Sequence, residues 1–343
     1  MGNRRIKLIA VAAFSALAVL GAACGSDGGT GDGGNAQAGM SGTVTISGSS
    51  TVQPISSLVA EDFSSANPDV QISVDGPGTS DGFVLFCKGE TDINDASRAI
   101  EPEEKQACKQ NGVSWVELPI AYDGITVMTN PDNSAVTCLN TGDLYALFGP
   151  ESQGFKTWSD ADTLDKEVDG TGNLPNLPLQ ITAPGQESGT YDAFITLAGI
   201  EDTALSRGVA EDKAAALRPD YQASANDNVI IQAMEGDPGA LGFVGFAYAE
   251  QAGSQIDIVQ VDGGSGCVAP SRDAIADHSY PLSRTLYIYV NKARIAENAA
   301  LKAYVDSYMT DQGIVSDVEQ VGYVDLPADQ IDASRATWSQ ASG

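Results

Sequence analysis

Two short hydroxyl-rich segments, each placed where a strand pattern gives way to a helix pattern, most constrain how this chain can fold. Gly48-Ser49-Ser50-Thr51 follows alternating residues 43–46, and Ser188-Gly189-Thr190 follows a strand-like stretch over 179–182. A helix N-terminus offers unpaired backbone N–H groups and the positive end of a dipole, so each segment can hold part of an oxyanion. Because the segments lie far apart in the sequence, they predict two lobes that close on one small anion.

The rest of the chain continues this alternation of strand and helix patterns. A chain of roughly 300 residues after its leader exceeds one compact core, so we expect two α/β lobes whose sheets are covered on both faces. Residues 116–129 form an extended apolar stretch long enough to cross between lobes, and residues 293–309 predict one long helix. Ligands of such sheets bind at the carboxyl ends of strands, where both hydroxyl-rich segments fall.

The N-terminus predicts export and lipid anchoring. A basic start and an apolar run over 8–23 precede Cys24, which is typical of a secretory signal. The Leu-Gly-Ala-Ala-Cys stretch resembles a bacterial lipobox, with Gly21 where the pattern usually has Leu. We expect removal of residues 1–23, lipid on Cys24 and a flexible tether over 24–42, on the outer face of the cytoplasmic membrane. A transmembrane anchor is the alternative, but the apolar run is shorter than the roughly 20 residues needed.

The charge of the chain is strongly acidic. Its formal net charge is −28, and removal of the leader takes away three basic residues and no acidic ones. Such a surface disfavours nucleic acid and anionic lipid as partners. Surface charge is screened over about 8–10 Å at moderate salt. An anion site in this chain must therefore depend on its own local donors.

Four cysteines follow Cys24, which is an even number in an exported chain. Of the three pairings, we favour Cys87–Cys108, because two short helices one strand apart can lie side by side. Cys138–Cys267 would then join the two ends of the middle segment. A zinc site is the alternative, but the chain has no C-x-x-C spacing and a single histidine, His278. Disulfides are favoured, and we expect no metal and no cofactor.

A third hydroxyl-rich loop and an arginine extend the candidate site. Thr79-Ser80 lies in a Gly-rich loop between a strand and a helix, and Arg98 follows a short predicted strand. The planar guanidinium can bind an oxyanion through two bonds. Each feature also has a structural interpretation, because Ser and Thr are ordinary helix caps and Arg98 could pair with Asp95 or Glu101. Three donor-rich helix starts and one arginine together favour an anion site.

Seven motifs, in order along nearly the whole chain, resemble the phosphate-binding proteins of bacterial ABC importers. They are Gly48-Ser-Ser-Thr-Val-Gln-Pro-Ile, Gly89-Glu-Thr-Asp-Ile-Asn-Asp-Ala-Ser-Arg, Ala121-Tyr-Asp-Gly-Ile-Thr-Val, Ser188-Gly-Thr-Tyr-Asp-Ala-Phe, Asp227-Asn-Val-Ile-Ile-Gln, Gly239-Ala-Leu-Gly-Phe-Val-Gly-Phe-Ala-Tyr and Tyr280-Pro-Leu-Ser-Arg. The resemblance implies a type II periplasmic-binding-protein fold with a hinge and a ligand cleft between two α/β lobes. Residues 43–122 and 280–343 would form lobe 1, and residues 123–279 lobe 2.

The same resemblance implies which residues hold phosphate. One lobe would contribute Ser50, Thr51, the backbone of Val52, Ser80 and Arg98, and the other lobe would contribute Ser188, Gly189 and Thr190. On this assignment, Arg98→Ala abolishes phosphate binding.

Two departures from the better-known relatives concern charge. In place of Arg98, the relatives carry an Asp that accepts the proton of hydrogen phosphate. They also carry an Arg before the Ser-Gly-Thr turn, where this chain has Pro184-Gly185-Gln186-Glu187. The arginine has moved from one lobe to the other. Asp81 and Asp123 are candidate acceptors, although either type of position is more often a turn or strand end. Without an acceptor, the site would also take sulfate.

We therefore expect a lipid-anchored, monomeric substrate-binding protein, not an enzyme, that captures inorganic phosphate and delivers it to a membrane ABC permease. A binder of another oxyanion such as sulfate is one alternative. A secreted phosphate-ester hydrolase with Ser50 or Ser188 as nucleophile is another, but Gln186 replaces the first glycine of a G-x-S-x-G elbow and no Walker loop is present. A surface adhesin or sensor that keeps the fold is a third.

Overall fold

The computed structural model describes residues 40–186 and 188–343. The expected leader over 1–23, the lipidation site Cys24 and nearly all of the tether over 24–42 lie outside these residues. In the described part of the chain, no helix combines the length and the apolar character needed to cross a bilayer.

The strands follow one path, in the order β2-β1-β3-β11-β4-β8-β6-β7. Its first half consists of β1 (Gly42–Gly48), β2 (Val70–Asp75), β3 (Ile93–Ala96), β11 (Ser283–Asn291) and the first ten residues of β4 (Trp115–Thr129). β1 pairs in parallel with β2 and β3, whereas β11 is antiparallel to β3 and β4. The carboxyl ends of β1 and β3 therefore meet at one edge.

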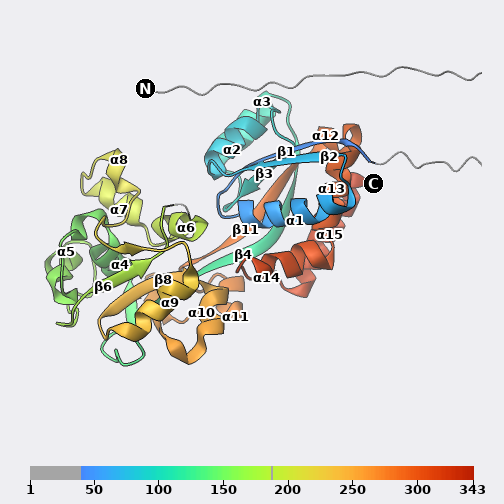
Figure 1. The fold of residues 1–343 in the computed structure, drawn as a ribbon. Helices are drawn as coiled ribbons and strands as arrows, with labels where there is room; N and C mark the ends of the chain where they lie inside the picture. Colours follow the sequence, from blue (N-terminus) through green and yellow to red (C-terminus); the bar gives the residue numbers. More distant parts are fainter. Residues whose placement is uncertain (1–39, 187) are drawn as a thin grey trace, which may run out of the picture. The chain divides into compact units, whose positions relative to one another are not determined.

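Helices cover both faces of this half. They are α1 (Gln53–Ala66), α2 (Thr79–Phe86), α3 (Pro102–Gln110), α12 (Lys292–Glu297), α13 (Ala299–Tyr308), α14 (Asp317–Gln320) and α15 (Ala328–Ser342). Figure 1 shows α2 and α3 on one side of β1 and β3 and α1 on the other. The apolar side chains accordingly form separate clusters, with Val59 of α1 in one and Phe83 of α2 in another. Full burial of one such side chain stabilises a fold by about 1.5–3 kcal/mol.

The sequence pattern explains α1 and corrects one predicted helix. Ile55, Val59 and Phe63 recur at helical spacing and are buried, and the helix ends before the predicted Asn-Pro stop. The single helix predicted over 293–309 is wrong, because α12 ends at Glu297 and α13 begins at Ala299. The Asn298 side chain accepts from the backbone N–H groups of two following residues, so it caps a new helix and interrupts the first.

The second half of the sheet begins within β4. Residues 125–129 of β4 pair antiparallel with β8 (Ala240–Gly245), and β9 (Asp257–Asp262) joins at the end of the same strand. β6 (Gln180–Ala183) runs parallel to β8, and β7 (Gln222–Ala223) continues beside it. β5 (Cys138–Asn140) and β10 (Cys267–Val268) both pair with β9. One long strand thus belongs to both halves, as the apolar stretch over 116–129 predicts.

The helices of the second half are α4 (Thr141–Phe148), α5 (Asp162–Glu167), α6 (Gly189–Leu197), α7 (Ile200–Ser206), α8 (Glu211–Ala214), α9 (Asp227–Gly236), α10 (Phe246–Ala252) and α11 (Arg272–Ala276). An aromatic cluster packs α4 and α6 against the sheet. Phe194 of α6 stacks on Phe243 of β8 with ring centroids 4.0 Å apart. Phe148 of α4 meets both rings edge-on. These contacts fix α6, and with it the second hydroxyl-rich segment, against the sheet.

Both favoured disulfides are present. Cys87–Cys108 joins the end of α2 to α3, and Cys138–Cys267 joins β5 to β10 across β9. All four cysteines are consumed in these bonds, which removes them as zinc ligands. Each bond typically stabilises a fold by about 2–4 kcal/mol, chiefly by restricting the unfolded chain.

Candidate anion-binding site

A cavity of about 470 Å³ lies where β1 and β3 end. It is lined by Ser49, Ser50, Thr51, Pro77, Gly78, Thr79, Ser80, Asp81, Ser97, Arg98, Asp192, Thr196, Leu197 and Arg284. Four of the predicted ligand residues, Ser50, Thr51, Ser80 and Arg98, therefore share one cavity. Val52 is fully buried beneath it, and its N–H donates to the Ser49 carbonyl at 3.2 Å.

The first hydroxyl-rich segment is held by its backbone. A Cβ on Gly48 would lie 2.0 Å from the Asp95 carbonyl oxygen, so only glycine allows the turn to approach β3 this closely. The Ser49 N–H donates to that same carbonyl at 2.9 Å, and the Ser49 hydroxyl accepts from the Thr51 N–H at 3.2 Å. No side chain caps α1, so the hydroxyls of Ser50 and Thr51 are available for other partners.

The second segment touches the first. The Thr51 Oγ1 donates to the Gly189 carbonyl at 3.2 Å, across 138 residues of sequence. A Cβ on Gly189 would lie 2.8 Å from the Thr51 Cα, which only glycine avoids. Ser188 caps α6, because its side chain accepts from the Thr190 N–H at 3.2 Å. The structure thus brings the two segments together at one side of the cavity, although Ser188, Gly189 and Thr190 do not line it.

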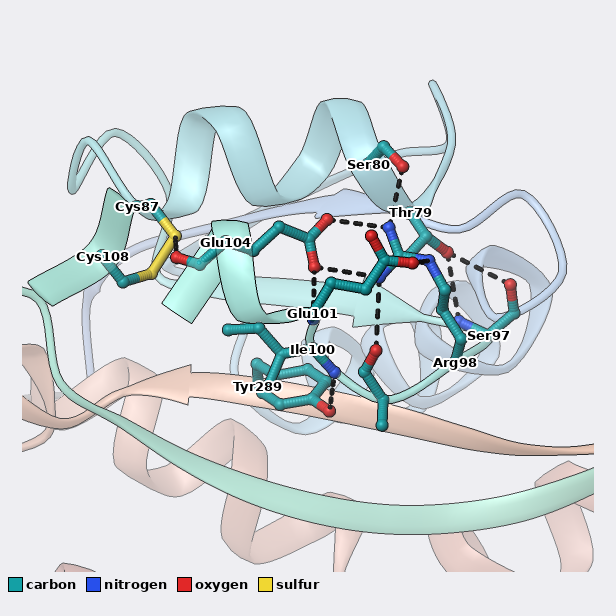
Figure 2. Close-up of polar contacts among 11 residues, drawn as sticks. Thr79, Ser80, Cys87, Ser97, Arg98, Ile100, Glu101, Glu104, Cys108 and Tyr289 are labelled. Carbon is teal, nitrogen blue, oxygen red and sulfur yellow. Dashed lines mark hydrogen bonds and ion pairs between the residues drawn. A yellow bond between two sulfur atoms is a disulfide. The ribbon is translucent and has the colours of Figure 1, made fainter. Parts of the chain in front are cut away.

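Arg98 borders the cavity with its charge already balanced. Its two terminal nitrogens donate to both carboxylate oxygens of Glu104, at 2.9 and 2.8 Å, and Glu101 lies 3.2 Å from its Nε. Figure 2 shows the same guanidinium reaching the Ser80 hydroxyl, to which it donates at 2.8 Å. The hydrogen bond to Glu104 is the main cause that raises the pKa of Arg98. The alternative that Arg98 pairs with Glu101 is thus realised, and the closer partner Glu104 was not foreseen.

Arg284 is a cationic cavity residue that was not predicted from the sequence. It lies directly opposite Asp123 in the pairing of β11 with β4, and its Nε donates to the Asp123 Oδ2 at 3.1 Å. Its Nη2 donates to the Thr51 Oγ1 at 2.8 Å. The Arg284 side chain is 13 % exposed and the Asp123 side chain 1 %. Burial raises the pKa of Asp123, and the neighbouring guanidinium opposes that rise.

The signal for Arg284 was present in the sequence. It ends the Tyr280-Pro-Leu-Ser-Arg motif, just before a strongly β-prone run. What the sequence did not reveal is that this strand pairs with the long crossing strand, which places the guanidinium beside Thr51.

The carboxylates near the cavity differ in their surroundings. Asp81 lines the cavity from the first turn of α2, whereas Asp123 is engaged by Arg284 and is not a lining residue. Asp192 of α6, which was not foreseen, lines the cavity and accepts from the Ser50 hydroxyl at 2.7 Å. His278 pairs instead with Thr285 and does not line the cavity, so it forms no nucleophile–base pair with Ser50 there.

Residues 33–312 match the PBP superfamily domain. The chain belongs to the PBP superfamily. It is 36 % identical over 299 residues to protein SphX of Synechocystis, which covers 87 % of this chain and 82 % of the relative. It is 32 % identical over 326 residues to the phosphate-binding protein PstS of Staphylococcus saprophyticus, which covers 94 % of this chain and 91 % of that protein.

Solved structures agree with this assignment to the PBP superfamily. The crystal structure of a possible phosphate binding protein from Planctomyces limnophilus superposes with a TM-score of 0.78 at 32 % identity, over 89 % of this chain and 100 % of that one. These comparisons confirm the resemblance inferred from the seven motifs and the α/β binding-protein fold that it implies. The Staphylococcus relative is a phosphate-binding protein, and the Planctomyces relative is a possible one.

Proposed function

We propose that this chain captures inorganic phosphate in the cavity and delivers it to a membrane ABC permease, without chemical change to the ligand. The observation that carries the proposal is the contact of two hydroxyl-rich helix starts, from the two halves of the sheet, beside a partly buried arginine. Residues 43–122 and 280–343 would act as one lobe and residues 123–279 as the other, with β4 as a connection. Similarity to phosphate-binding relatives supports the choice of anion.

The contacts to the anion divide between the lobes. Hydroxyls of Ser50, Thr51 and Ser80 and the Val52 backbone would contact the anion from lobe 1, with Arg98 at the rim. Ser188, Gly189 and Thr190 would complete the site from lobe 2 when the lobes close on the ligand. The strongly acidic surface does not prevent anion binding. Donors that touch the anion in a closed cleft outweigh the screened charge of the surface.

We assign the main charged contact to Arg284, not to Arg98. The Arg98 guanidinium is shared between Glu104, Glu101 and Ser80, so its charge is compensated. Arg284 uses Nε and Nη2, and no protein acceptor for its Nη1 occurs in the described part of the chain. A charge-assisted donor beside the Thr51 hydroxyl is well suited to a doubly charged oxyanion.

We also propose that the chain is exported and held at the outer face of the cytoplasmic membrane by lipid on Cys24. The basic start, the apolar run and the lipobox-like motif support this, and two disulfides suit an oxidising compartment. Mass spectrometry of the protein purified from membranes would detect the diacylglyceryl group, and Cys24→Ser would release the protein.

Calorimetric titration with phosphate tests the assignment of the cation. We expect saturable binding by the wild type and a loss of affinity of about a hundredfold or more in Arg284→Ala, on the order of 3 kcal/mol. Arg98→Ala should lose less than about tenfold in phosphate affinity, because the charge of Arg98 is already paired. If Arg98→Ala lost more phosphate affinity than Arg284→Ala, Arg98 would be the main charged contact.

A further inference from the structure

We infer that Asp192 distinguishes a protonated oxyanion from sulfate in this cavity, an inference that rests on the proposed function. Asp192 lines the cavity from the first turn of α6, and its Oδ2 accepts from the Ser50 hydroxyl at 2.7 Å. It is the carboxylate that directly contacts the first hydroxyl-rich segment. Arg284 donates to the next residue of that segment, Thr51, so acceptor and cation flank the same turn.

The hydrogen bond determines what Ser50 can offer to a ligand. A hydroxyl carries one proton, and the proton of Ser50 is committed to Asp192. The Ser50 oxygen therefore presents lone pairs, and the Asp192 carboxylate accepts in this hydrogen bond. Both groups suit a ligand that brings its own O–H.

This acceptor pair separates two anions of similar size and charge. Phosphate near neutral pH retains a proton and can donate to Asp192 or Ser50. Sulfate carries no proton, so its oxygens would face lone pairs and a negative charge. A closed site built around a ligand's donor rejects an analogue that lacks it, because the acceptors facing the ligand then remain unpaired.

The other nearby carboxylates are placed less well for this role. Asp123 is engaged by Arg284 and does not line the cavity, and Glu104 is engaged by Arg98. Asp81 lines the cavity, but within residues 40–186 and 188–343 it makes no hydrogen bond to either hydroxyl-rich segment. Of the carboxylates in the described part of the chain, Asp192 alone combines a cavity position with a bond to a predicted ligand residue.

The backbone of Asp192 is held by the packing of α6. Two residues further along α6, Phe194 stacks on Phe243, and the Asp192 carbonyl accepts from the Thr196 hydroxyl at 3.0 Å. The residue lies in the first turn of the helix. Asp192 thus lies beside the first hydroxyl-rich segment, at Ser50.

Titration of the purified chain with phosphate and with sulfate tests this inference. Asp192→Asn keeps the shape but replaces an acceptor oxygen with a donor, and Asp192→Ala removes the carboxylate without adding a donor. We expect the phosphate-over-sulfate affinity ratio to fall by about a hundredfold in Asp192→Asn, with a gain in sulfate affinity. Asp192→Ala should lose phosphate affinity by about tenfold, and its gain in sulfate affinity should be smaller than that of Asp192→Asn. Asp202→Asn, a matched first-turn acid of α7 outside the cavity, should retain the wild-type ratio.

An unchanged ratio in both Asp192 variants, with tight phosphate binding by the wild type, would overturn the inference and leave the proposed function intact. The inference would also be overturned if Asp81→Asn, and not Asp192→Asn, admitted sulfate. A wild-type chain that binds neither anion would contradict the proposed function itself, so the two failures are distinguishable.

Discussion

Arg284 and Asp123 face each other on neighbouring antiparallel strands, and the Arg284 Nε donates to the Asp123 Oδ2 at 3.1 Å. Asp123 lies two residues before Ile125, where β4 begins to pair with the second half of the sheet. The guanidinium that reaches Thr51 is therefore anchored on the strand that connects the two halves. Any movement of the halves about β4 acts close to the charge that we assign to the ligand.

Asp123→Asn should weaken both phosphate binding and the fold. The amide cannot balance the guanidinium charge, and loss of one member of a buried ion pair typically costs about 3–5 kcal/mol. The partial exposure of Arg284 reduces that figure, so we expect about 1–3 kcal/mol by urea unfolding and a tenfold or greater loss of phosphate affinity by calorimetry. Wild-type values for both quantities would show that Asp123 does not position Arg284.

Gly189→Ala should reduce phosphate affinity by about tenfold or more while leaving thermal stability nearly unchanged. The added Cβ would lie 2.8 Å from the Thr51 Cα and 3.0 Å from its nitrogen, so the two hydroxyl-rich segments must separate. Gly236→Ala is the matched control, because it also lies in a helix and its Cβ would meet open space. Equal affinities in the two variants would contradict the close contact of the segments.

Glu104→Gln should raise phosphate affinity by about two- to tenfold. The glutamate binds Arg98 through both oxygens and also accepts from the Glu101 N–H at the start of α3. Its neutralisation frees part of the Arg98 charge toward the cavity and removes a nearby negative charge. The titration should show a smaller gain at high salt, since screening weakens both effects. A fall in affinity would mean that Arg98 contributes best when held by Glu104.

The stability of the protein should fall as pH rises from about 4 to about 8, partly because of Asp95. Burial raises the pKa of Asp95 from 3.8 to about 8. Between these values the folded state binds more protons than the unfolded state, so each unit of rising pH removes up to about 1.4 kcal/mol. Burial also raises the pKa of Asp165 to about 7, which adds a smaller dependence of the same sign.

Asp95→Asn isolates this contribution. Urea unfolding at pH 5 and at pH 8 should show a smaller loss of stability in the variant than in the wild type, because the amide does not titrate. The Ser56 hydroxyl, which donates to the Asp95 Oδ1 at 2.9 Å, retains an acceptor in the amide oxygen. If the free energy of unfolding falls equally with pH in the two proteins, a group other than Asp95 causes the pH dependence.

Local sequence chemistry was enough to locate the two hydroxyl-rich segments. Ser50 and Thr51 follow a strand and precede an apolar helix, and the same holds for Ser188 and Thr190, so strand-to-helix turns could be identified without tertiary information. The disulfide Cys87–Cys108 followed from the same local reasoning.

The charged residues were harder to predict, because their roles depend on long-range pairing. Arg284 and Asp123 are separated by 161 residues and meet only because β11 pairs with β4. Asp192 faces the cavity because Phe194 fixes the orientation of α6, which periodicity alone does not determine. The break at Asn298 was detectable, since asparagine is a common cap, but the continuous apolar stripe over both helices concealed it.

A crystal structure of the wild-type chain with phosphate tests the central claim most directly. We expect the anion in the cavity at hydrogen-bond distance, about 2.7–3.2 Å, from the Arg284 guanidinium and the Thr51 hydroxyl. Its remaining oxygens should contact Ser50 and the turn that begins α6. Phosphate bound to Arg98 without Arg284, or bound outside this cavity, would contradict the assignment.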